Sequence, residues 1–472
     1  MQRYDIPLCV DLDGTLIHSD LLVESAFALL RRNPFYLACF LVWLLRGRAH
    51  LKQEIARRAR LEVSRLPYDE RVLAWLRDDA RRPRVLCSAA DQQLAREVAA
   101  HVGGFDDVLA SDGVRNLGGT RKAELLHARY GQRGYDYVGN APVDLAVWRH
   151  ARRAIVANAP AWLLRRVRAT PMFERAFERR HAGPKAWLRA LRVHQWSKNL
   201  LLFVPLLAAH RVFDAAAVAS TLVAFLAFSL CASATYLVND LLDLDADRRH
   251  PRKRFRPFAA GTLPLVAGLV AAPLLLLAAI VLALQLPAGF VAILLAYAAT
   301  TLAYSFLLKR VAVLDVLTLS ALYTLRIIAG GEAIPVEISS WLLAFSLFLF
   351  LGLALVKRYA EVERVAAEAG TRLAGRGYQV AHRVPILVAG IASSALGVVV
   401  LAFYIDSTKS AELYARPHLL WSLTPLLAYW LARVWRIARA GRMHDDPVVF
   451  ALTDRVSLGV LAAFVLVVYF AT

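Results

Sequence analysis

The distribution of apolar residues divides the chain near residue 185. Before this point, charged and apolar residues mix as in a soluble α/β domain. From Leu200 onward, apolar stretches of membrane length follow one another with short loops between them. The expected spans are 199–211, 214–238, 262–284, 287–307, 313–334, 338–356, 385–405, 418–436 and 454–471. The pattern predicts an N-terminal α/β domain, followed by an all-α membrane bundle of about nine transmembrane helices.

Two segments of the first half need a separate interpretation. Phe35 to Leu45 is apolar for only about eleven residues, too short to span a bilayer, so it predicts a buried or interfacial helix of the soluble domain. Residues 161–198 carry many arginines with tryptophans between them, which is typical of a linker or an amphipathic helix on the inner leaflet. The expected domains are 1–160 (soluble), 161–190 (basic linker or interfacial helix) and 191–472 (membrane part).

The charges of the loops predict an orientation. The connections that hold Arg252 to Arg256, Lys309 and Arg310, Lys357 to Arg376, and Arg433 to Arg442 are basic, and the alternate connections are not. By the positive-inside rule, the N-terminus lies inside and the C-terminus outside. We therefore expect a multi-pass protein of a bacterial inner membrane, with its soluble domain and its polar motifs facing the cytoplasm.

Composition agrees with a membrane protein. Of the 472 residues, 58% are hydrophobic, which is rare in a soluble protein of this length. The net charge of +20 fits basic cytoplasmic loops and anionic lipid or phosphate ligands, and no compact basic module indicates nucleic-acid binding. The four cysteines show no paired or metal-binding spacing and predict reduced thiols. Acidic residues interrupt the apolar start, so no secretory signal is expected.

An acidic motif ends one apolar stretch and runs directly into a basic one. On a helix, Asn239, Asp240, Asp243 and Asp247 fall within an arc of roughly 100°, while Asp245 points elsewhere. The basic segment from Arg248 to Pro257 follows at once. Charges beside lipid are costly and indicate function. Oxygen ligands favour Mg²⁺, with a diphosphate bridging the cation and the basic residues. A solvated helix end is the structural alternative.

Further polar residues lie at expected membrane depth, where they too are costly. All but Arg326 are expected near the cytoplasmic ends of their helices, so one shared pocket is possible. For the two lysines of the set that flank the spans, Lys198 and Lys357, snorkelling to the interface is the alternative. Asp315 is expected to be a second metal ligand, and an ion pair with Arg326 is its alternative. The candidate substrate-binding residues here are Lys198, Tyr304, Lys309, Arg326, Lys357 and Arg358.

The soluble half carries its own chemistry. Asp11 ends an apolar strand and Asp13 follows two residues later before a glycine turn, so one carboxylate can be a nucleophile and the other a general acid/base. Ser88 ends a second strand and can bind phosphate, and Lys122 begins a helix and can neutralise phosphate charge. Asp144, after a third strand, supplies a second metal-binding acid.

The motif Asn239-Asp240-x-x-Asp243-x-x-x-Asp247-Arg248, with Tyr304-Ser305 and Asp315, resembles the UbiA-type intramembrane prenyltransferase superfamily over roughly residues 185–472. Within it, the segments from Arg192 to Asn199 and from His250 to Gly261 are similar to the decaprenyl-phosphate phosphoribosyltransferase branch. That resemblance implies phosphoribosyl pyrophosphate as the donor and a polyprenyl phosphate as the acceptor. Leu319 stands where a second motif usually repeats an aspartate, which suits a donor held by fewer carboxylates.

Residues 1 to about 160 resemble the haloacid dehalogenase superfamily of phosphohydrolases, with Leu16 to Arg82 as a helical cap. The resemblance implies that Asp11 forms an aspartyl-phosphate and that Asp13 protonates the leaving group. The phosphate would be held by Ser88 and Lys122, and Mg²⁺ by Asp11, Asp13 and Asp144. Asn140 stands where the family usually has an acid, so the fold is better indicated than the activity.

The leading interpretation is a two-domain enzyme. Mg²⁺ on Asp240, Asp243 and Asp247, aided by Lys253, Arg254 and Arg256, would neutralise the departing diphosphate. Lys198 or Arg326 would hold the attacking lipid phosphate. The soluble domain would then hydrolyse the phosphate from the 5-position of the ribose in the lipid product. Two alternatives remain open: transfer of a prenyl group from prenyl diphosphate to an aromatic or small acceptor, and a transporter with a regulatory soluble domain. Chain length of the lipid and oligomeric state do not follow from the sequence.

Overall fold

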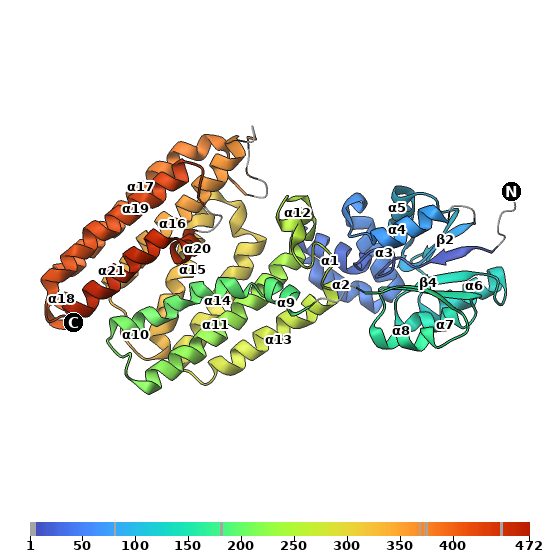
Figure 1. The fold of residues 1–472 in the computed structure, drawn as a ribbon, viewed down its shortest axis with the longest axis horizontal. Helices are drawn as coiled ribbons and strands as arrows, with labels where there is room; N and C mark the ends of the chain where they lie inside the picture. The colour runs from blue at the N-terminus through green and yellow to red at the C-terminus, as the bar shows by residue number, and fades with distance from the viewer. Residues whose placement is uncertain are drawn as a thin grey trace. The chain divides into compact units, whose positions relative to one another are not determined.

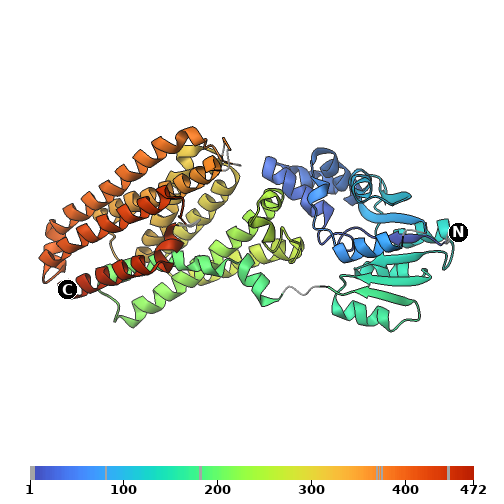
Figure 2. The same cartoon turned by 45° about the horizontal axis from the view of Figure 1, so that its top comes forward.

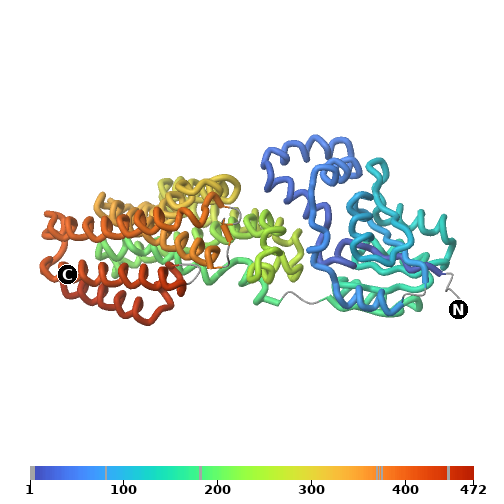
Figure 3. The backbone as a smooth tube through the Cα atoms, turned by 90° about the horizontal axis from the view of Figure 1, so that it is seen from above, coloured from blue at the N-terminus to red at the C-terminus, as the bar shows by residue number. Residues whose placement is uncertain are grey.

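The computed structural model describes residues 6–79, 82–179, 183–367, 370–371, 373, 376–443 and 447–472. The chain forms two compact units, one made of Met1–Leu191 with Tyr236–Pro273 and the other of Arg192–Thr235 with Leu274–Thr472. The helix α11 (Ala215–Leu242) runs from the second unit into the first. Figures 1, 2 and 3 follow the chain through both units by colour.

A parallel six-stranded sheet with the order β3-β2-β1-β4-β5-β6 organises the first unit. Its central strand β1 is entirely buried, as expected of a parallel strand covered on both faces. The strands are β1 (Leu8–Val10), β2 (Arg84–Asp91), β3 (Asp107–Ser111), β4 (Asp136–Gly139), β5 (Arg153–Ala157) and β6 (Phe173–Phe177), and the helices that follow them are α5 (Gln92–Val102), α6 (Gly119–Tyr130), η2 (Pro142–Asp144), α7 (Leu145–Trp148) and α8 (Ala161–Arg168). The prediction of an N-terminal α/β domain is confirmed.

The sheet continues beyond the expected boundary at residue 160. The strand β6 pairs in parallel with β5, and α8 packs Leu163 and Val167 into the core. Much of the stretch that was expected to be a linker or an interfacial helix therefore belongs to the α/β domain. The arginines on the outer face of α8 explain the difference, because an arginine-rich amphipathic helix has the same sequence pattern on a sheet and on a membrane.

The interval between β1 and β2 is helical, as the cap interpretation expects. It holds α1 (Leu21–Arg32), α2 (Tyr36–Leu45), α3 (Arg48–Arg58), η1 (Val63–Arg65) and α4 (Glu70–Asp78). The side chain of Asp20 caps the N-terminus of α1, and that of Asp69 caps α4. The first of these caps fixes the start of α1, shortly after the loop that carries Asp11 and Asp13.

The remaining helices form a multi-pass membrane region. Six of the described helices are long and apolar enough to cross a membrane, or seven if the pair α20 and α21, bent by 77°, counts as one span. The expected nine spans are therefore not confirmed. One reason is that residues 199–211 form a 3-10 helix followed by a short α-helix; another is that α19 has only 17 residues. The elements are α9 (Pro184–Ala190), η3 (Val193–Phe203), α10 (Val204–Ala208), α11, α12 (Leu244–Arg249), η4 (Lys253–Phe255), α13 (Leu265–Ala283), α14 (Ala288–Phe306), η5 (Leu308–Arg310), α15 (Ala312–Ala333), α16 (Ser340–Ala367), η6 (Val380–His382), α17 (Arg383–Ile405), α18 (Thr408–Leu413), η7 (Pro417–Ser422), α19 (Leu423–Arg439), α20 (Pro447–Thr453) and α21 (Arg455–Ala471).

In the second unit, η3 lies directly against α15. A Cβ atom at Gly330 would lie 2.2 Å from the carbonyl oxygen of Leu202, so only glycine permits this approach. The close packing places the polar residues of η3 beside those of α15. It is the feature of the membrane fold that most directly builds a site.

Candidate active sites

The carboxyl end of the first unit's sheet gathers the predicted phosphatase residues. Lys122 Nζ donates to Asp11 Oδ1 at 2.7 Å and to the Tyr137 hydroxyl at 2.9 Å. That hydroxyl donates in turn to Asp144 Oδ1 at 2.9 Å. The backbone amide of Asn140 donates to Asp144 Oδ2 at 3.0 Å. Because parallel strands end at the same edge, residues more than a hundred positions apart form one buried network.

The charges of this network are set by burial and by close pairing. Burial raises the pKa of Asp11 to about 6, although the positive charge of Lys122 acts in the opposite direction. Burial also raises the pKa of Asp13 well above its ordinary value. Burial opposes the charge of Lys122, but the carboxylates of Asp11 and Asp144 raise its pKa above the usual range. Acid/base catalysis requires two neighbouring carboxyl groups in different protonation states, one protonated and one ionised.

A cavity of about 800 Å³ opens over this network. Asp11, Asp13 and Lys122 line it, while Ser88 is buried outside its lining and accepts a hydrogen bond from the amide of Ala90 at 3.0 Å. Sequence reasoning missed Lys52 of α3, which lines the cavity and donates to the carbonyl of Ala89 and to Asn116. No local motif marks this lysine, because it reaches the site only through the folding of the helical insertion.

The acidic motif is split between two helices. The helix α11 ends at Leu242, and Asp243 is the N-cap residue of α12, so the single helical face expected for the motif is interrupted there. Asp240 and Asp247 still converge, because Arg256 Nη1 donates to both, at 3.1 and 2.7 Å. Asp243 forms an ion pair with Arg31, with 3.6 Å between Asp243 Oδ1 and Arg31 Nε.

The other residues of the motif and of its basic flank differ in exposure. Asp245 pairs with Arg249 at the exposed surface, as its expected direction implied. Asn239 is half-buried on α11, while Lys253 and Arg254 are exposed on η4. The Arg254 guanidinium lies 4.8 Å from the centroid of the Phe255 ring. Two exposed cations, close in sequence to two buried carboxylates, suit the binding of an anion from water.

The donor set of this motif suits Mg²⁺. Among the described residues, no three His, Cys, Asp or Glu side chains converge to hold a metal ion. Two carboxylates do converge on Arg256, and Mg²⁺ at phosphate sites commonly takes one or two carboxylates together with substrate phosphates and water. Burial and the nearby Asp240 raise the pKa of Asp247 to about 6, in spite of Arg256. The motif thus holds negative charge that a cation would stabilise.

In the second unit, Asp315 is bound by cations. Arg376 Nη1 donates to its Oδ1 at 2.8 Å, the Tyr304 hydroxyl donates to the same oxygen at 2.7 Å, and the buried Arg358 contacts both oxygens. The side chain of Glu361 also contacts Arg358. Both carboxylate oxygens of Asp315 thus contact arginines, as Asp240 and Asp247 contact Arg256, and its role as a second metal ligand stays a prediction. Sequence reasoning did not identify Arg376.

A second polar group of this unit joins η3 to α15. Arg326 Nε donates to Asn199 Oδ1 at 2.9 Å, and its Nη2 donates to the Tyr297 hydroxyl at 3.0 Å. The ring of Tyr323 lies 5.5 Å from the Arg326 guanidinium and 5.9 Å from Lys198 Nζ. The structure thus brings Lys198 and Arg326 to one aromatic ring. The ion pair of Arg326 with Asp315, which the sequence left open as an alternative, is not formed among the described residues; Arg326 binds Asn199 instead.

The two remaining predicted cations lie elsewhere. Lys309 is half-buried in the short η5, and Lys357 is half-buried on α16, one residue before Arg358. Both have interaction partners in the structure.

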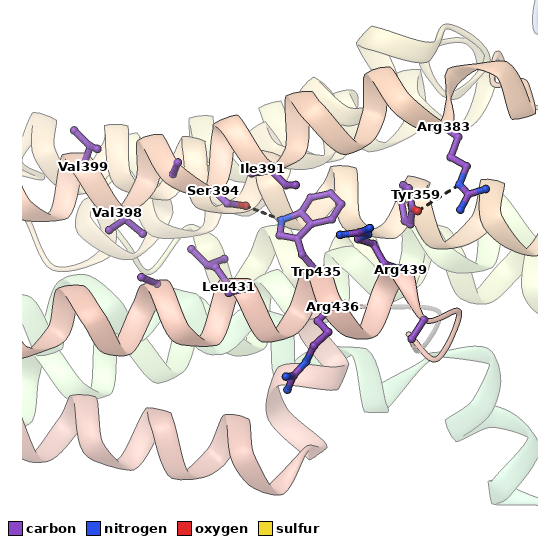
Figure 4. Close-up of a pocket in the computed structure, with 14 residues that line it drawn as sticks. Tyr359, Arg383, Ile391, Ser394, Val398, Val399, Leu431, Trp435, Arg436 and Arg439 are labelled. Atoms are coloured by element: carbon purple, nitrogen blue, oxygen red, sulfur yellow. Dashed lines mark hydrogen bonds between the residues drawn. The ribbon is translucent and has the colours of Figure 1, made fainter.

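A cavity of about 910 Å³ lies along α17 and α19 of the second unit. Figure 4 shows apolar side chains such as Val398, Val399 and Leu431 along one part of it, and basic ones at the other. There, Arg383 donates to the Tyr359 hydroxyl at 3.4 Å, and Arg436 and Arg439 are exposed. None of the residues predicted from the sequence lines this cavity.

Comparison with known proteins identifies a family for the helical part of the chain and relatives over longer and shorter stretches. The model of the UbiA prenyltransferase family matches residues 200–469. The chain is 38% identical to protein y4nM of Sinorhizobium fredii over 97% of its own length and 90% of that protein. It is 42% identical to the decaprenyl-phosphate phosphoribosyltransferase of Mycolicibacterium smegmatis over 190 residues, 39% of this chain and 59% of that enzyme.

Solved structures cover the two parts separately. A UbiA homologue from Archaeoglobus fulgidus bound to GPP and Mg²⁺ is similar over 60% of this chain and 99% of its own, with 16% identity and a TM-score of 0.45. A phosphoserine phosphatase in its apo form is similar over 37% of this chain and 94% of its own, with 15% identity and a TM-score of 0.27.

Proposed function

The chain belongs to the UbiA prenyltransferase family, and from this premise we propose that its membrane part transfers 5-phosphoribosyl from phosphoribosyl pyrophosphate to a polyprenyl phosphate. Diphosphate is the leaving group. The observation that carries the proposal is the guanidinium of Arg256 bound to both Asp240 and Asp247, with two further exposed cations on η4. The identity to a decaprenyl-phosphate phosphoribosyltransferase supports the choice of substrates.

The donor site works by neutralising charge. Asp240 and Asp247 would hold Mg²⁺, with Asp243 at the break between their two helices, and the ion would offset the negative charge that develops on diphosphate. Arg256, released from its carboxylates, can then donate to a phosphate oxygen, and Lys253 and Arg254 can reach the distal phosphate. The bond between the anomeric carbon and diphosphate breaks as the lipid phosphate oxygen approaches that carbon.

The acceptor needs positioning rather than deprotonation. A phosphate monoester is already an anion at neutral pH and can attack directly. Lys198 and the buried Arg326 meet at the ring of Tyr323, and they would hold this anion. The network of Arg358, Arg376 and Asp315 would keep two further guanidinium groups in fixed directions. We propose that the donor site faces the cytoplasm, in accordance with the positive-inside rule.

The soluble domain is proposed to remove the 5-phosphate of the lipid product. Asp11 attacks phosphorus, the bond from phosphorus to the ribose oxygen breaks, and Asp13 gives its proton to that oxygen. Water then hydrolyses the aspartyl-phosphate, with Asp13 as the base. Lys122 stays charged and binds the phosphate oxygens. Mg²⁺, held by Asp11, Asp13 and Asp144, would shield the phosphate charge. The backbone amide of Asn140 donates to Asp144, while the Asn140 side chain lacks the second acid that the family usually has.

The test is direct. Purified full-length protein in vesicles is given labelled phosphoribosyl pyrophosphate and a polyprenyl phosphate, and the lipid extract is analysed. Wild type should give a lipid-linked ribose, and Asp11→Asn a lipid-linked ribose 5-phosphate. A labelled product formed from prenyl diphosphate and an aromatic acceptor, with none from phosphoribosyl pyrophosphate, would replace the proposal by the general prenyl transfer of the family. Equal phosphate release by wild type and Asp11→Asn would reject the phosphatase step alone.

A further inference from the structure

The helix α2 presents an apolar face that nothing in the described structure covers. Tyr36, Phe40 and Trp43 pack toward the small core formed with α1 and α3. The other face consists of residues at helical spacing, with Leu37 exposed by 60%, Leu41 by 64% and Leu45 by 89%. No residue of α2 is buried. A continuous exposed apolar surface of this kind indicates a binding partner.

The same helix borders the candidate phosphatase site. Leu44 lines the cavity of about 800 Å³ that also contains Asp11 and Lys122. On another wall of this cavity lie Leu265 and Val266, which are the first residues of α13. This helix is one of the six that can cross a membrane, so its first residues lie near the membrane surface. Within the first unit, the cavity and α2 are therefore placed beside the start of a membrane span.

Charge around α2 suits an anionic lipid surface. Arg32 ends the preceding helix, and the exposed Arg46 and Arg48 follow α2, whereas Arg31 is paired with Asp243. Basic residues beside an apolar helical face favour binding to anionic headgroups. With ten residues, α2 is about 15 Å long, too short to cross the hydrocarbon core. The combination describes a helix that lies in the interface.

We propose that α2 inserts its apolar face into an anionic bilayer and that the adjoining cavity takes a phosphomonoester carried on a lipid. This inference rests on the proposed phosphatase function, to which it adds the membrane contact that brings the pocket to its lipid-borne substrate. The cavity fits such a molecule, because Asp11 and Lys122 line its phosphate end, while Leu22, Leu44, Leu51, Leu265 and Val266 supply apolar surface. A free sugar phosphate would leave that apolar surface unused.

The first experiment measures the depth of α2 in lipid. A fluorescent nitrobenzoxadiazole group is placed on Leu41→Cys in a Cys39→Ser background, where the other three cysteines are buried. Full-length protein is reconstituted in vesicles that contain phosphatidylglycerol and a lipid-borne quencher. The label should shift to the blue and be quenched. The control is Val114→Cys, exposed by 87% in the same domain, and its label should stay in water.

Two results of this experiment would overturn the proposal. One is a label on α2 that the lipid quencher does not reach. The other is a label that is shielded without lipid quenching, to a degree that rises with protein concentration, because a second copy of the chain would then cover α2.

The second experiment measures which substrate depends on α2. Leu41→Asp with Val42→Asp should slow hydrolysis of lipid-linked ribose 5-phosphate in vesicles by about tenfold, since two apolar side chains leave the lipid. Hydrolysis of free ribose 5-phosphate should not change, and Val114→Asp should change neither rate. Equal slowing of both substrates, or of neither, would overturn the proposal. If wild type hydrolyses neither substrate, the phosphatase function fails, and with it the named substrate class, while the depth of the label still decides whether α2 contacts lipid.

Discussion

Asp240 and Asp245 are acids five residues apart with different surroundings. Asp240 is buried and shares Arg256 with Asp247, whereas Asp245 pairs with Arg249 at the surface. We expect Asp240→Asn to lower phosphoribosyl transfer at least about 100-fold, because electrostatic stabilisation of the departing diphosphate is lost. The matched control Asp245→Asn should stay within about twofold, as exposed pairs contribute little. Incorporation of labelled donor into lipid measures both. Equal loss in the two variants would contradict the assignment.

At this scale, strand-end motifs were the most predictable part of the site. Asp11, Lys122 and Asp144 meet because parallel strands end at one edge, a rule that needs no knowledge of the loops. Lys52 and Arg376 could not be identified in this way. Each reaches its site from an irregular or inserted segment whose path depends on tertiary packing, which no local spacing reports.

The contact of η3 with α15 allows a prediction for a pair of helices. Gly330→Ala places a Cβ atom 2.2 Å from the carbonyl oxygen of Leu202, so η3 must move and Asn199 loses its position beside Arg326. We expect a lower unfolding temperature in micelles and lower transferase activity. Gly459→Ala on α21 is the control, because its Cβ atom meets nothing within 4 Å. That variant should be as stable as wild type or slightly more stable. Identical behaviour of the two variants would show that η3 is not held here.

The N-terminus of α4 allows a prediction about pH. Asp69 is 2% exposed, and although burial opposes its charge, hydrogen bonds from Arg71 and Asn158 lower its pKa to about 2. A depressed pKa means that the stabilisation is complete above the unfolded value near 4 and disappears as the pH falls toward 2. Asp69→Asn should thus cost about 2 kcal/mol at pH 7, and less on acidification. Glu70→Gln, at an exposed position in the same turn, should cost little. Unfolding temperatures at pH 7 and pH 3 test this, and a constant cost would refute it.

The elements show where sequence patterns stop being informative. Long apolar spans such as α13 were located correctly, since length and hydropathy alone define them. The pattern of α8 fitted a sheet and a membrane surface equally well, and only the pairing of β6 with β5 decides between them. The short η3 and α10 were expected to be one span, because hydropathy does not distinguish a 3-10 helix from an α-helix.

At the largest scale, one buried ion pair joins residues 224 positions apart in the chain. Arg248 donates to both carboxylate oxygens of Glu24, at 2.6 and 2.8 Å, and to the carbonyl of Ala259 at 3.0 Å. This pair connects α1, which follows the loop of Asp11 and Asp13, to α12, which carries Asp247. Nothing in the sequence indicated it, because neither residue belongs to a pattern that involves the other. Gly261 packs closely against His18 in the same region, because a Cβ atom added at Gly261 would lie only 2.6 Å from the Cβ atom of His18.

A buried pair of this kind predicts how the two proposed activities depend on one another. Glu24→Gln leaves a buried guanidinium without its counter-charge, which should cost about 3 kcal/mol, whereas Glu24→Leu combined with Arg248→Met removes both charges and should cost much less. If the pair keeps the phosphatase pocket beside the acidic motif, Glu24→Gln should release more 5-phosphorylated lipid before it is hydrolysed, with the hydrolysis of free ribose 5-phosphate retained. The ratio of the two lipid products over time measures this. Arg249→Gln, which removes an exposed cation one residue further, is the control. An unchanged product ratio in Glu24→Gln would mean that the pair serves stability alone.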